Sequence, residues 1–379
     1  MSTRAFVNGR VPLDGRLVDD RTVVVAGGRI QAVDVGAPPS GVIIDDLAGD
    51  LLLPGFIDVQ VNGGGGILFN DSPSVESIAD IARAHRQFGT TGFLPTLISD
   101  RLSVVERGIR AVADAIAGNV PGVLGIHIEG PFVSESRRGV HDRRKLRHLT
   151  HDLLNEIRPL ENGKTVLTVA PESVDDGVIR TLTDRGFIVC LGHSDATYEE
   201  TRSALNDGAR GFTHLFNAMS QLGVRAPGMV GAALDGDDAW CGIIADGHHV
   251  DPVALRVAYR CKPRDKLMLV SDAMPPVGSD ITTFSLLDRS VSVHDGVCKD
   301  QNGTLAGTAL DMATALRNFM RFTGIDLIRA LPLATESPAR FLGVDDRLGH
   351  VRAGSTANLI VTDSELNVRR SYIGGEAID

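Results

Sequence analysis

The chain has 379 residues, of which 43% are hydrophobic and 23% are charged, and its formal net charge is −10. This is the balance of an ordinary globular protein, and the negative charge argues against a nucleic-acid partner, which usually meets a basic face. The N-terminus lacks the apolar core of a secretory signal, and no apolar run is long enough to span a bilayer. We therefore expect a cytoplasmic protein with no membrane contact and with its four cysteines reduced, since none forms a C-x-x-C pair.

Both ends of the chain contain short β-rich runs separated by turn residues. The N-terminal runs are Ala5–Val7, Thr22–Val25 and Val42–Ile44, and the C-terminal runs are Asn358–Val361 and Ser371–Ile373. Neither end is large enough to hold a core of its own. We expect residues 1–54 and 345–379 to pair into one small β-sandwich domain.

Between these ends, residues 55–344 alternate short apolar runs with helical stretches. The expected strands are Phe56–Val61, Phe93–Ile98, Leu124–Ile128, Val166–Val169, Ile188–Leu191, Phe212–Phe216, Trp240–Ala245 and Leu267–Val270. The expected helices include Ser74–Phe88, Leu102–Ala117, Leu149–Leu160, Pro252–Cys261, Thr308–Phe322 and Ile325–Leu342, with a β-rich excursion over Thr283–Gly303. Eight apolar strands with intervening helices predict an α/β fold, a (β/α)₈ TIM barrel. An open doubly wound sheet is the alternative.

Polar residues follow five of the eight expected strands. Strand three ends in His127-Ile128-Glu129, strand five in Gly192-His193, strand seven in Asp246-Gly247-His248-His249, and strand eight in Ser271-Asp272, while strand six carries Thr213-His214 and continues to Asn217-Ala218-Met219. In a barrel, these strand ends meet at the carboxyl mouth, where active sites are built. A single polar residue there would be weak evidence, but five strands ending this way predict an active site.

The residue types at these ends suit a metal hydrolase. Glu129, His193 and His214 supply one carboxylate and two imidazoles, which with water in the fourth position match a catalytic zinc site. Asp272 is the expected general base, which takes the proton of the water and passes it to the leaving amine. A lone histidine would more often be a hydrogen-bonded structural residue, so the prediction depends on the three ligands occurring together.

Several stretches resemble the N-acetylglucosamine-6-phosphate deacetylase family of the amidohydrolase superfamily. The superfamily likeness lies in Leu53-Pro54-Gly55-Phe56-Ile57-Asp58. The deacetylase likeness lies in the stretches 127–132 (HIEGPF), 192–194 (GHS), 213–219 (THLFNAM), 245–250 (ADGHHV), 271–273 (SDA) and 305–307 (LAG). The resemblance covers essentially the whole chain. It implies hydrolysis of N-acetylglucosamine 6-phosphate to glucosamine 6-phosphate and acetate by a metal-activated water, in amino-sugar catabolism.

The first strand departs from the superfamily pattern. Many members have two histidines, H-x-H, where this chain has Gln60-Val61-Asn62. Glutamine and asparagine are poor zinc ligands beside imidazole and carboxylate, and the variant is similar to the single-metal branch of the deacetylases. We therefore expect one divalent metal per chain, with zinc first and iron, cobalt or manganese as alternatives. The simpler interpretation of Gln60 and Asn62 is loop structure before the glycine run.

The resemblance also implies the substrate contacts. It assigns oxyanion stabilisation to His141 and phosphate binding to Arg225, which would reach the site of the neighbouring subunit in a homodimer. The remaining implied contacts are Gln60, Val140, Asn217, Ala218, Asp246, Gly247, His248, His249, Leu305, Ala306 and Gly307, with His249 rather than His248 as the matching histidine. The basic run Arg137–Arg147 has two interpretations, a mobile lid over an anionic substrate or an ordinary solvated charge run.

Three other functions stay open at this point. N-acetylgalactosamine 6-phosphate differs from the glucosamine substrate at one hydroxyl, and no single residue decides between them. A cyclic-amide hydrolase or deaminase would resemble the H-x-H pattern, which Gln60-Val61-Asn62 breaks. A catalytically inactive binding protein would be expected to have lost part of its ligand set, whereas Glu129, His193, His214 and Asp272 are all present.

Overall fold

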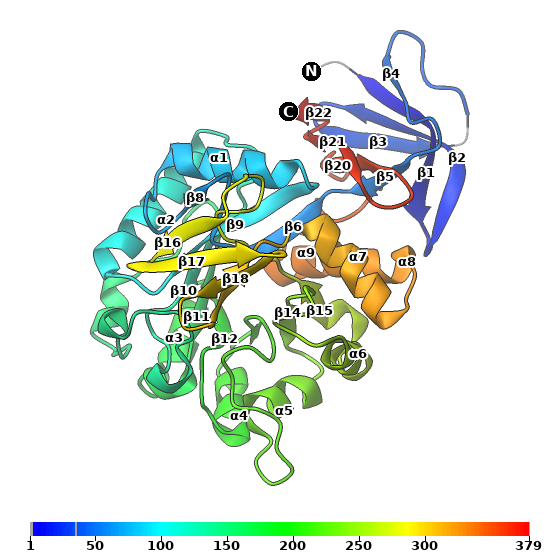
Figure 1. Cartoon of the computed structure of the whole chain (residues 1–379). Coiled ribbons are helices and arrows are strands. Elements are labelled where there is room, and N and C mark those ends of the chain that lie inside the picture. The colour runs from blue at the N-terminus through cyan, green and yellow to red at the C-terminus, as the bar shows by residue number, and fades with distance from the viewer. Residues whose placement is uncertain (1–2, 35, 379) are drawn as a thin grey trace.

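The computed structural model describes residues 3–34 and 36–378, and its centre is a parallel barrel (Figure 1). Eight strands lie in the order β15-β14-β13-β12-β11-β10-β9-β6. A parallel bridge between Val61 and Ala273 joins the first strand to the segment after the last, so the sheet closes on itself. The bounds are β6 (Phe56–Val61), β9 (Thr90–Ile98), β10 (Gly125–Glu129), β11 (Lys164–Val169), β12 (Ile188–Leu191), β13 (Gly211–Phe212), β14 (Trp240–Ile243) and β15 (Leu267–Leu269). The predicted TIM barrel is confirmed.

Helices surround the barrel, as Figure 1 shows. Their starts follow local signals: Ser74 caps α1 through its side chain, and Thr197 and Glu200 form a capping box at α4. The helices are α1 (Val75–Arg86), α2 (Leu102–Ala117), α3 (Val178–Asp184), α4 (Tyr198–Asn206), α5 (Gly228–Asp235), α6 (Pro252–Cys261), α7 (Met312–Thr323), α8 (Leu327–Ala330) and α9 (Glu336–Leu342). In the described part of the chain, none of them has the length and apolar character that a membrane span needs.

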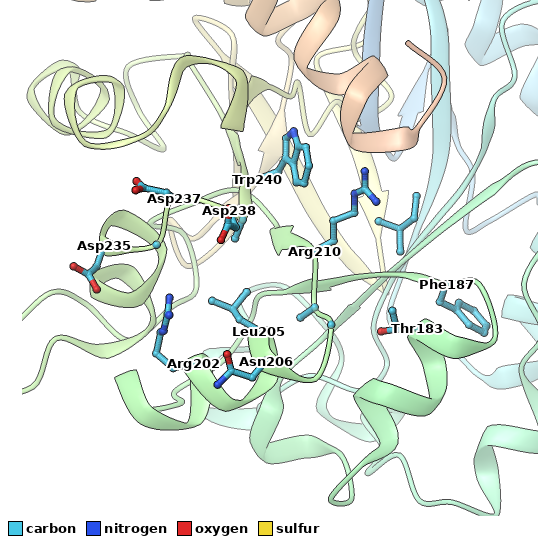
Figure 2. A pocket seen from close by; sticks show the side chains of 15 residues that line it. Thr183, Phe187, Arg202, Leu205, Asn206, Arg210, Asp235, Asp237, Asp238 and Trp240 are labelled. Atoms are coloured by element: carbon cyan, nitrogen blue, oxygen red, sulfur yellow. The ribbon is translucent and has the colours of Figure 1, made fainter. Parts of the chain in front are cut away.

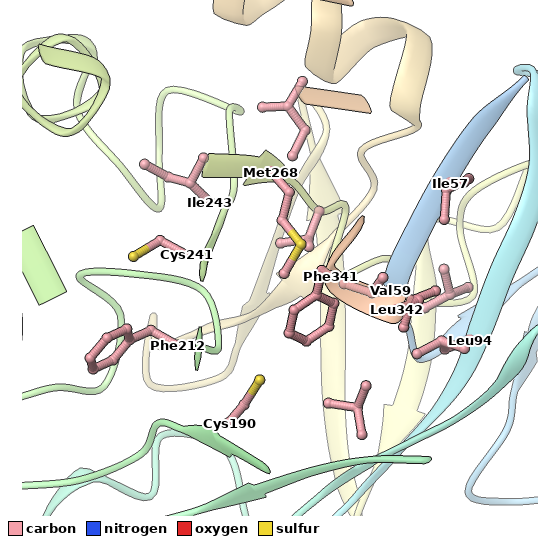
Figure 3. Close-up of a cluster of buried hydrophobic side chains, with 14 of the residues drawn as sticks. Ile57, Val59, Leu94, Cys190, Phe212, Cys241, Ile243, Met268, Phe341 and Leu342 are labelled. Atoms are coloured by element: carbon pink, nitrogen blue, oxygen red, sulfur yellow. The ribbon is translucent and has the colours of Figure 1, made fainter. Parts of the chain in front are cut away.

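Apolar side chains of the barrel strands and of the surrounding helices form one large buried core (Figure 3). Phe212, Phe341 and Leu94 are fully or almost fully buried there, and Cys190 and Cys241 lie among them. All four cysteines are free, and only Cys261 is exposed. This close-packed core supports the strands, so the polar groups at their carboxyl ends stand on a rigid scaffold.

The two chain ends form a second sheet with its own small core. Its order is β22-β21-β20-β5-β1-β2-β3, with β4 paired to β1. The two ends meet where β20 pairs antiparallel with β5, from Leu359–Pro54 to Thr362–Leu51. The strands are β1 (Arg4–Leu13), β2 (Arg16–Ala26), β3 (Arg29–Asp34), β4 (Ile43–Asp46), β5 (Leu51–Pro54), β20 (Leu359–Thr362), β21 (Val368–Ile373) and β22 (Glu376–Ile378). The small β-domain is confirmed, and its exact division from the barrel at residues 54 and 345 stays a prediction.

The β-rich excursion after the barrel folds into a sheet near the carboxyl mouth. It contains β16 (Thr283–Leu286), β17 (Arg289–His294), β18 (Val297–Asp300) and β19 (Leu305–Thr308). Its buried face packs with Ile98 and Met274 in one apolar cluster. A two-stranded sheet, β7 (Gly63–Gly64) and β8 (Ile67–Leu68), follows β6.

Three expected helices are wrong in part. Only a short 3₁₀ turn, Leu153–Glu156, forms within 149–160. Backbone groups of this stretch form hydrogen bonds with distant residues instead of with one another: the N–H of Leu149 donates to the carbonyl of Ser173. The stretch 308–322 becomes helical only at Met312, after the side-chain cap Asp311. The stretch 325–342 is broken into α8, a 3₁₀ turn at 331–334 and α9, since Pro332 has no N–H to continue a helix. The expected sixth strand is also shorter than Phe212–Phe216 and ends at Phe212.

Candidate metal centre and active site

Three side chains from the ends of β10, β12 and β13 converge at the carboxyl mouth of the barrel. The Oε1 atom of Glu129, at the end of β10, lies 3.0 Å from His193 Nε2 and 2.8 Å from His214 Nε2. The two imidazole nitrogens are 3.0 Å apart. All three residues are buried, with 2–6% of their surface exposed, so the cluster is a closed set of one oxygen and two nitrogen donors.

This arrangement fits a divalent metal. Two imidazole Nε2 atoms and one carboxylate oxygen that converge on one point would together hold a divalent cation. His193 Nδ1 donates to the backbone carbonyl of Arg137 at 2.9 Å, which leaves its Nε2 lone pair for a ligand. Burial raises the pKa of Glu129, but the adjoining His193 and His214 rings outweigh it and hold that pKa well below its usual value. The carboxylate is therefore ionised, as a metal ligand must be.

The backbone at these strand ends is strained. His193, His214 and Asp272 have φ values of 49°, 36° and 51°, a region that non-glycine residues seldom occupy. Such strain persists only where the surrounding structure holds it, and it gathers at active sites. Here it turns three polar side chains toward one point above the apolar core.

Asp272 lies beside the cluster and is held by two side-chain amides. Asn62 Nδ2 and Gln60 Nε2 donate to its Oδ1 atom at 2.6 and 3.1 Å, and Gln60 Nε2 also lies 3.0 Å from Glu129 Oε2. Burial and then the charge of Glu129 raise the pKa of Asp272 to about 6. Both amides bond one oxygen, so the other oxygen of Asp272 is left to exchange a proton.

His141 is held from the side of strand β9. Ser99 Oγ lies 2.6 Å from His141 Nδ1, and the backbone N–H of Ser99 points to the same atom at 3.4 Å. A backbone N–H can only donate, so these contacts favour a ring with its proton on Nε2. Gly130 makes room for this arrangement, since a Cβ atom there would collide with Ser99 Oγ. Burial, and then the neighbouring His193, lower the pKa of His141 to about 3, so the ring is neutral.

Asp246 and His249 form a hydrogen-bonded pair just after strand β14. Asp246 accepts the side chain of His249 at 2.6 Å and the backbone N–H groups of His248 and His249 at 2.8 Å each. Burial raises the pKa of Asp246, but the contacts with His249 and the backbone N–H groups of His248 and His249 together outweigh it, so the pKa lies below its usual value. The pair leaves His249 Nε2 directed away from Asp246.

A cavity of about 130 Å³ joins these groups. Of the residues expected from the sequence, those that line it are Glu129, Val140, His141, His193, His214, Asn217, Ala218, His249, Asp272, Leu305 and Gly307. Gln60 and Asp246 do not line it but bond residues that do. Gly247, Ala306 and His248 are not part of the lining, and His248 is exposed.

Arg225 does not line the cavity of its own chain. It is exposed and lies in the loop before α5, which projects from the barrel in Figure 1. Its neighbours Leu222 and Val224 are 58% and 104% exposed.

The basic run 137–147 is largely paired with acidic residues. Arg137 contacts Asp195 at 2.8 Å, Arg143 contacts Glu135 at 2.7 Å, and Lys145 contacts Asp100 at 3.0 Å. This pairing favours the interpretation of the run as an ordinary surface charge run.

A second cavity, of about 550 Å³, lies at the opposite end of the barrel (Figure 2). Its walls include Ile188, Arg210 and Trp240, at or just before the amino ends of β12, β13 and β14. Arg210 bonds the carbonyl of Arg340 at 3.0 Å and stacks on Trp240. This cavity is larger than the one at the mouth, but barrel enzymes place their chemistry at the carboxyl end.

Sequence reasoning did not assign Ser99 and Asn62 to the site. Ser99 directly follows β9, so the strand-end rule that found the other residues would also have found it. Asn62 was weighed only as a possible ligand or loop residue, whereas it bonds Asp272 across 210 positions. Ile98 and Met274 also line the cavity, and nothing in their residue types would have indicated that.

The chain is similar to known proteins along nearly its whole length. Residues 51–378 match the model of the amidohydrolase family. The N-acetylgalactosamine-6-phosphate deacetylase of Shewanella sp. strain ANA-3 is 44% identical over 88% of this chain and 84% of its own. The N-acetylglucosamine-6-phosphate deacetylase of Haemophilus influenzae is 34% identical over 98% of both chains. The crystal structure of N-acetylglucosamine-6-phosphate deacetylase from Pasteurella multocida superposes with a TM-score of 0.94 at 35% identity, covering 99% of each chain.

Proposed function

The chain belongs to the amidohydrolase family, and on this premise we propose that it hydrolyses N-acetylglucosamine 6-phosphate to glucosamine 6-phosphate and acetate, a step of amino-sugar catabolism. It is a metal-dependent hydrolase. One observation carries the proposal: Glu129, His193 and His214 form a buried donor set in the same cavity as Asp272. The relatives of the chain are named for deacetylation of phosphorylated amino sugars.

The metal is one divalent ion per chain, and we favour zinc. Three protein donors with an open fourth position are typical of catalytic zinc, although iron, cobalt and manganese accept the same donors. The amide nitrogen of Gln60 donates to Glu129 and Asp272, so this residue acts as a hydrogen-bond donor and not as a ligand for a second ion. A bound divalent ion supplies Lewis acidity, which lowers the pKa of a water molecule and polarises an acyl oxygen.

Asp272 moves the proton. The oxygen of water forms a bond to the acetyl carbon, Asp272 takes a proton from that water, the C–N bond breaks, and the proton goes to the sugar nitrogen. Asn62 and Gln60 fix the Oδ1 atom of Asp272, so the carboxylate cannot rotate away. A general base held within reach of the proton that it moves is what this chemistry requires.

His141 stabilises the charge that develops on the acetyl oxygen. Its Nε2–H is a neutral donor that needs no rearrangement during the reaction, because Ser99 already holds Nδ1. Ser99 is thus a positioning residue. Asn217, Ala218, Val140, His249, Leu305 and Gly307 line the same cavity and would contact the sugar, and Gln60 would act on the substrate through Glu129 and Asp272, which it bonds.

Arg225 would bind the 6-phosphate in the site of a neighbouring subunit. Three features support this: its exposure, its absence from the cavity of its own chain, and the exposed apolar side chains of Leu222 and Val224 beside it. Arginine suits phosphate because its planar fork donates two hydrogen bonds at once. The active form would then be a homodimer, and we place it in the cytoplasm, where phosphorylated sugars are held.

A second substrate has support of its own. The Shewanella relative, at 44% identity, is named for N-acetylgalactosamine 6-phosphate. That sugar differs from the first only at one hydroxyl, and the proposed chemistry at the acetamido group is the same.

The test is a deacetylation panel on the metal-loaded protein, with both phosphorylated sugars and unphosphorylated N-acetylglucosamine. We expect kcat/KM to be highest for one of the two phosphorylated sugars, and Arg225→Ala to reduce it while changing the unphosphorylated sugar much less. Absence of hydrolysis on every sugar, in protein shown to hold its metal, would contradict an enzymatic function.

The subunit exchange test addresses the position of Arg225. Inactive Asp272→Asn chains mixed with Arg225→Ala chains should regain activity, since each mixed dimer holds one site with both groups intact. Mixed dimers that are verified by mass and stay inactive would place Arg225 in the site of its own chain.

A further inference from the structure

The junction between the barrel and the terminal sheet holds a cavity lined by arginine residues. Its volume is about 530 Å³, within the range of sites that bind small molecules. Arg86 comes from the last turn of α1, Arg4 from β1, and Arg369 and Arg370 from β21. No acidic residue is among the described residues that line it. Figure 1 shows the end of α1 beside the terminal strands.

Arg86 is the unusual member of this set. Only 8% of its surface is exposed, and its Nε atom is buried without a hydrogen-bond partner. Within residues 3–34 and 36–378, no carboxylate forms an ion pair with it. A buried cation without a partner is costly, so its presence needs an explanation.

The end of α1 does not supply that explanation. A helix C-terminus stabilises cations through its free carbonyl groups, but the last two carbonyls of α1 accept other hydrogen bonds. The carbonyl of Arg86 accepts Ser371 Oγ at 2.7 Å and the N–H of Gly89 at 3.0 Å, and that of His85 accepts the N–H of Phe88 at 3.0 Å. Burial, and then the like charge of Arg83, lower the pKa of Arg86, so the surroundings disfavour its charge.

The other arginines differ from Arg86 because each has an acidic partner. Arg4 and Arg370 share Asp45, the second at 3.7 Å, and Arg369 contacts Asp50 at 2.9 Å. They surround the cavity with donors, and acidic residues offset part of their charge. The wall also contains the apolar residues Val368, Ala377 and Ile378, which suit the organic part of a small molecule.

We propose that this junction cavity, which we call the arginine pocket, binds a phosphate monoester through Arg86. A dianionic phosphate would supply the missing charge, and the guanidinium fork of Arg86 would bond two of its oxygens. The volume exceeds what a free phosphate ion fills, and the apolar wall would cover the rest of the ligand. This site is separate from the metal centre and does not depend on the deacetylase function.

The test compares phosphate-dependent stabilisation in matched variants of the full-length protein. A ligand that binds the folded state raises the melting temperature Tm. We would measure Tm in phosphate-free buffer, then with inorganic phosphate and, separately, with glucose 6-phosphate. Arg86→Gln removes the buried charge. Arg83→Gln is the control, since Arg83 lies on the same helix and pairs with Asp80 at the surface. Any binding at the metal centre is common to both variants.

We expect both ligands to raise the Tm of the parent and of Arg83→Gln, with the ester binding more tightly than inorganic phosphate. Arg86→Gln should bind at least about tenfold more weakly, the effect of one lost charge-assisted hydrogen bond. Arg370→Gln, at a side chain 63% exposed, cannot disturb the core and should weaken binding several-fold.

Two results would overturn the proposal. If Arg86→Gln responds to phosphate as the parent does, the anion binds elsewhere. If phosphate binds only after residue 379, which follows the lining residue Ile378, is deleted, the chain itself and not a phosphate ester occupies the pocket.

Discussion

The terminal sheet and the carboxyl mouth of the barrel both hold non-glycine residues with positive φ, and they differ in what those residues do. In the terminal sheet, Asn8 and Asp20 have φ values of 56° and 55°, and both are exposed at register shifts between β1 and β2. At the mouth, His193, His214 and Asp272 have similar φ values, but their side chains meet in one cavity. Strained backbone alone therefore only bends a strand. It indicates function where the side chains are also shielded from solvent and converge.

Removing the metal should abolish the activity at the carboxyl mouth of the barrel and leave the terminal sheet folded. This is the largest effect that we expect. Chelation should abolish hydrolysis, and a divalent metal should restore it, at about one equivalent per chain as three ligands and water imply. Activity assays with metal analysis would measure this. Circular dichroism before and after chelation would show whether the fold survives. Two equivalents of tightly bound metal would contradict the single site inferred from Gln60 and Asn62.

Asp272→Asn should separate proton transfer from metal binding. The variant keeps the shape of the side chain but cannot take a proton, so kcat should fall by ~10²–10⁴ while the metal content stays the same. The control is Asp311→Asn, because Asp311 only caps α7 and asparagine caps equally well. A near-normal kcat for Asp272→Asn would mean that another group carries the proton.

Ser99→Ala should have a smaller effect, because it removes the support of a donor and not the donor itself. We expect kcat to fall by about 10- to 100-fold, less than the ~10²–10³ for loss of an oxyanion donor, with KM nearly unchanged. Ser337→Ala is the matched control: Ser337 is equally buried, and its hydroxyl has no hydrogen-bond partner. If both variants behave alike, or if Ser99→Ala changes only KM, Ser99 does not position His141.

The barrel was predictable from sequence because its strands are short apolar runs, which bury both faces. The stretch 149–160 misled for the opposite reason. Leu149, Leu154, Ile157 and Leu160 are buried at roughly helical spacing, yet Leu149 pairs with Ser173 and the N–H of Leu160 bonds Thr165. Tertiary hydrogen bonds determine the backbone conformation there, and the local spacing of apolar residues contains no information about them.

The residues of the candidate site were also only partly predictable from the sequence. Strand ends meet at one edge of any barrel, so the sequence could bring Glu129, His193, His214 and Asp272 together without a structure. The roles assigned to them stay predictions. The bond between Ser99 and His141 spans 42 positions and depends on the absence of a side chain at Gly130. The partner of Arg225 lies outside the single chain, so its role depends on an assembly that one sequence does not describe.

The last prediction compares a buried aspartate of the barrel, Asp58, with a half-buried aspartate next to the terminal sheet, Asp363, and expects pH effects of opposite sign. Burial raises the pKa of Asp58 to about 7, so the folded state holds a proton that the unfolded chain loses near pH 4. Stability should therefore fall as the pH rises from about 4 to 7, by up to ~1.4 kcal/mol per pH unit from this group. Asp363 is the reverse case: hydrogen bonds from the side chain and backbone of Asn367 lower its pKa, and its contribution is lost on acidification below about pH 4.

Denaturant titrations of Asp58→Asn and Asp363→Asn against the parent would measure both, since all other groups cancel in each difference. Asp58→Asn should gain stability relative to the parent between pH 5 and 7. Asp363→Asn should be less stable than the parent at neutral pH, and this difference in stability should disappear only in acid. A pH-independent difference for Asp58→Asn would mean that Asp58 stays ionised in the folded barrel.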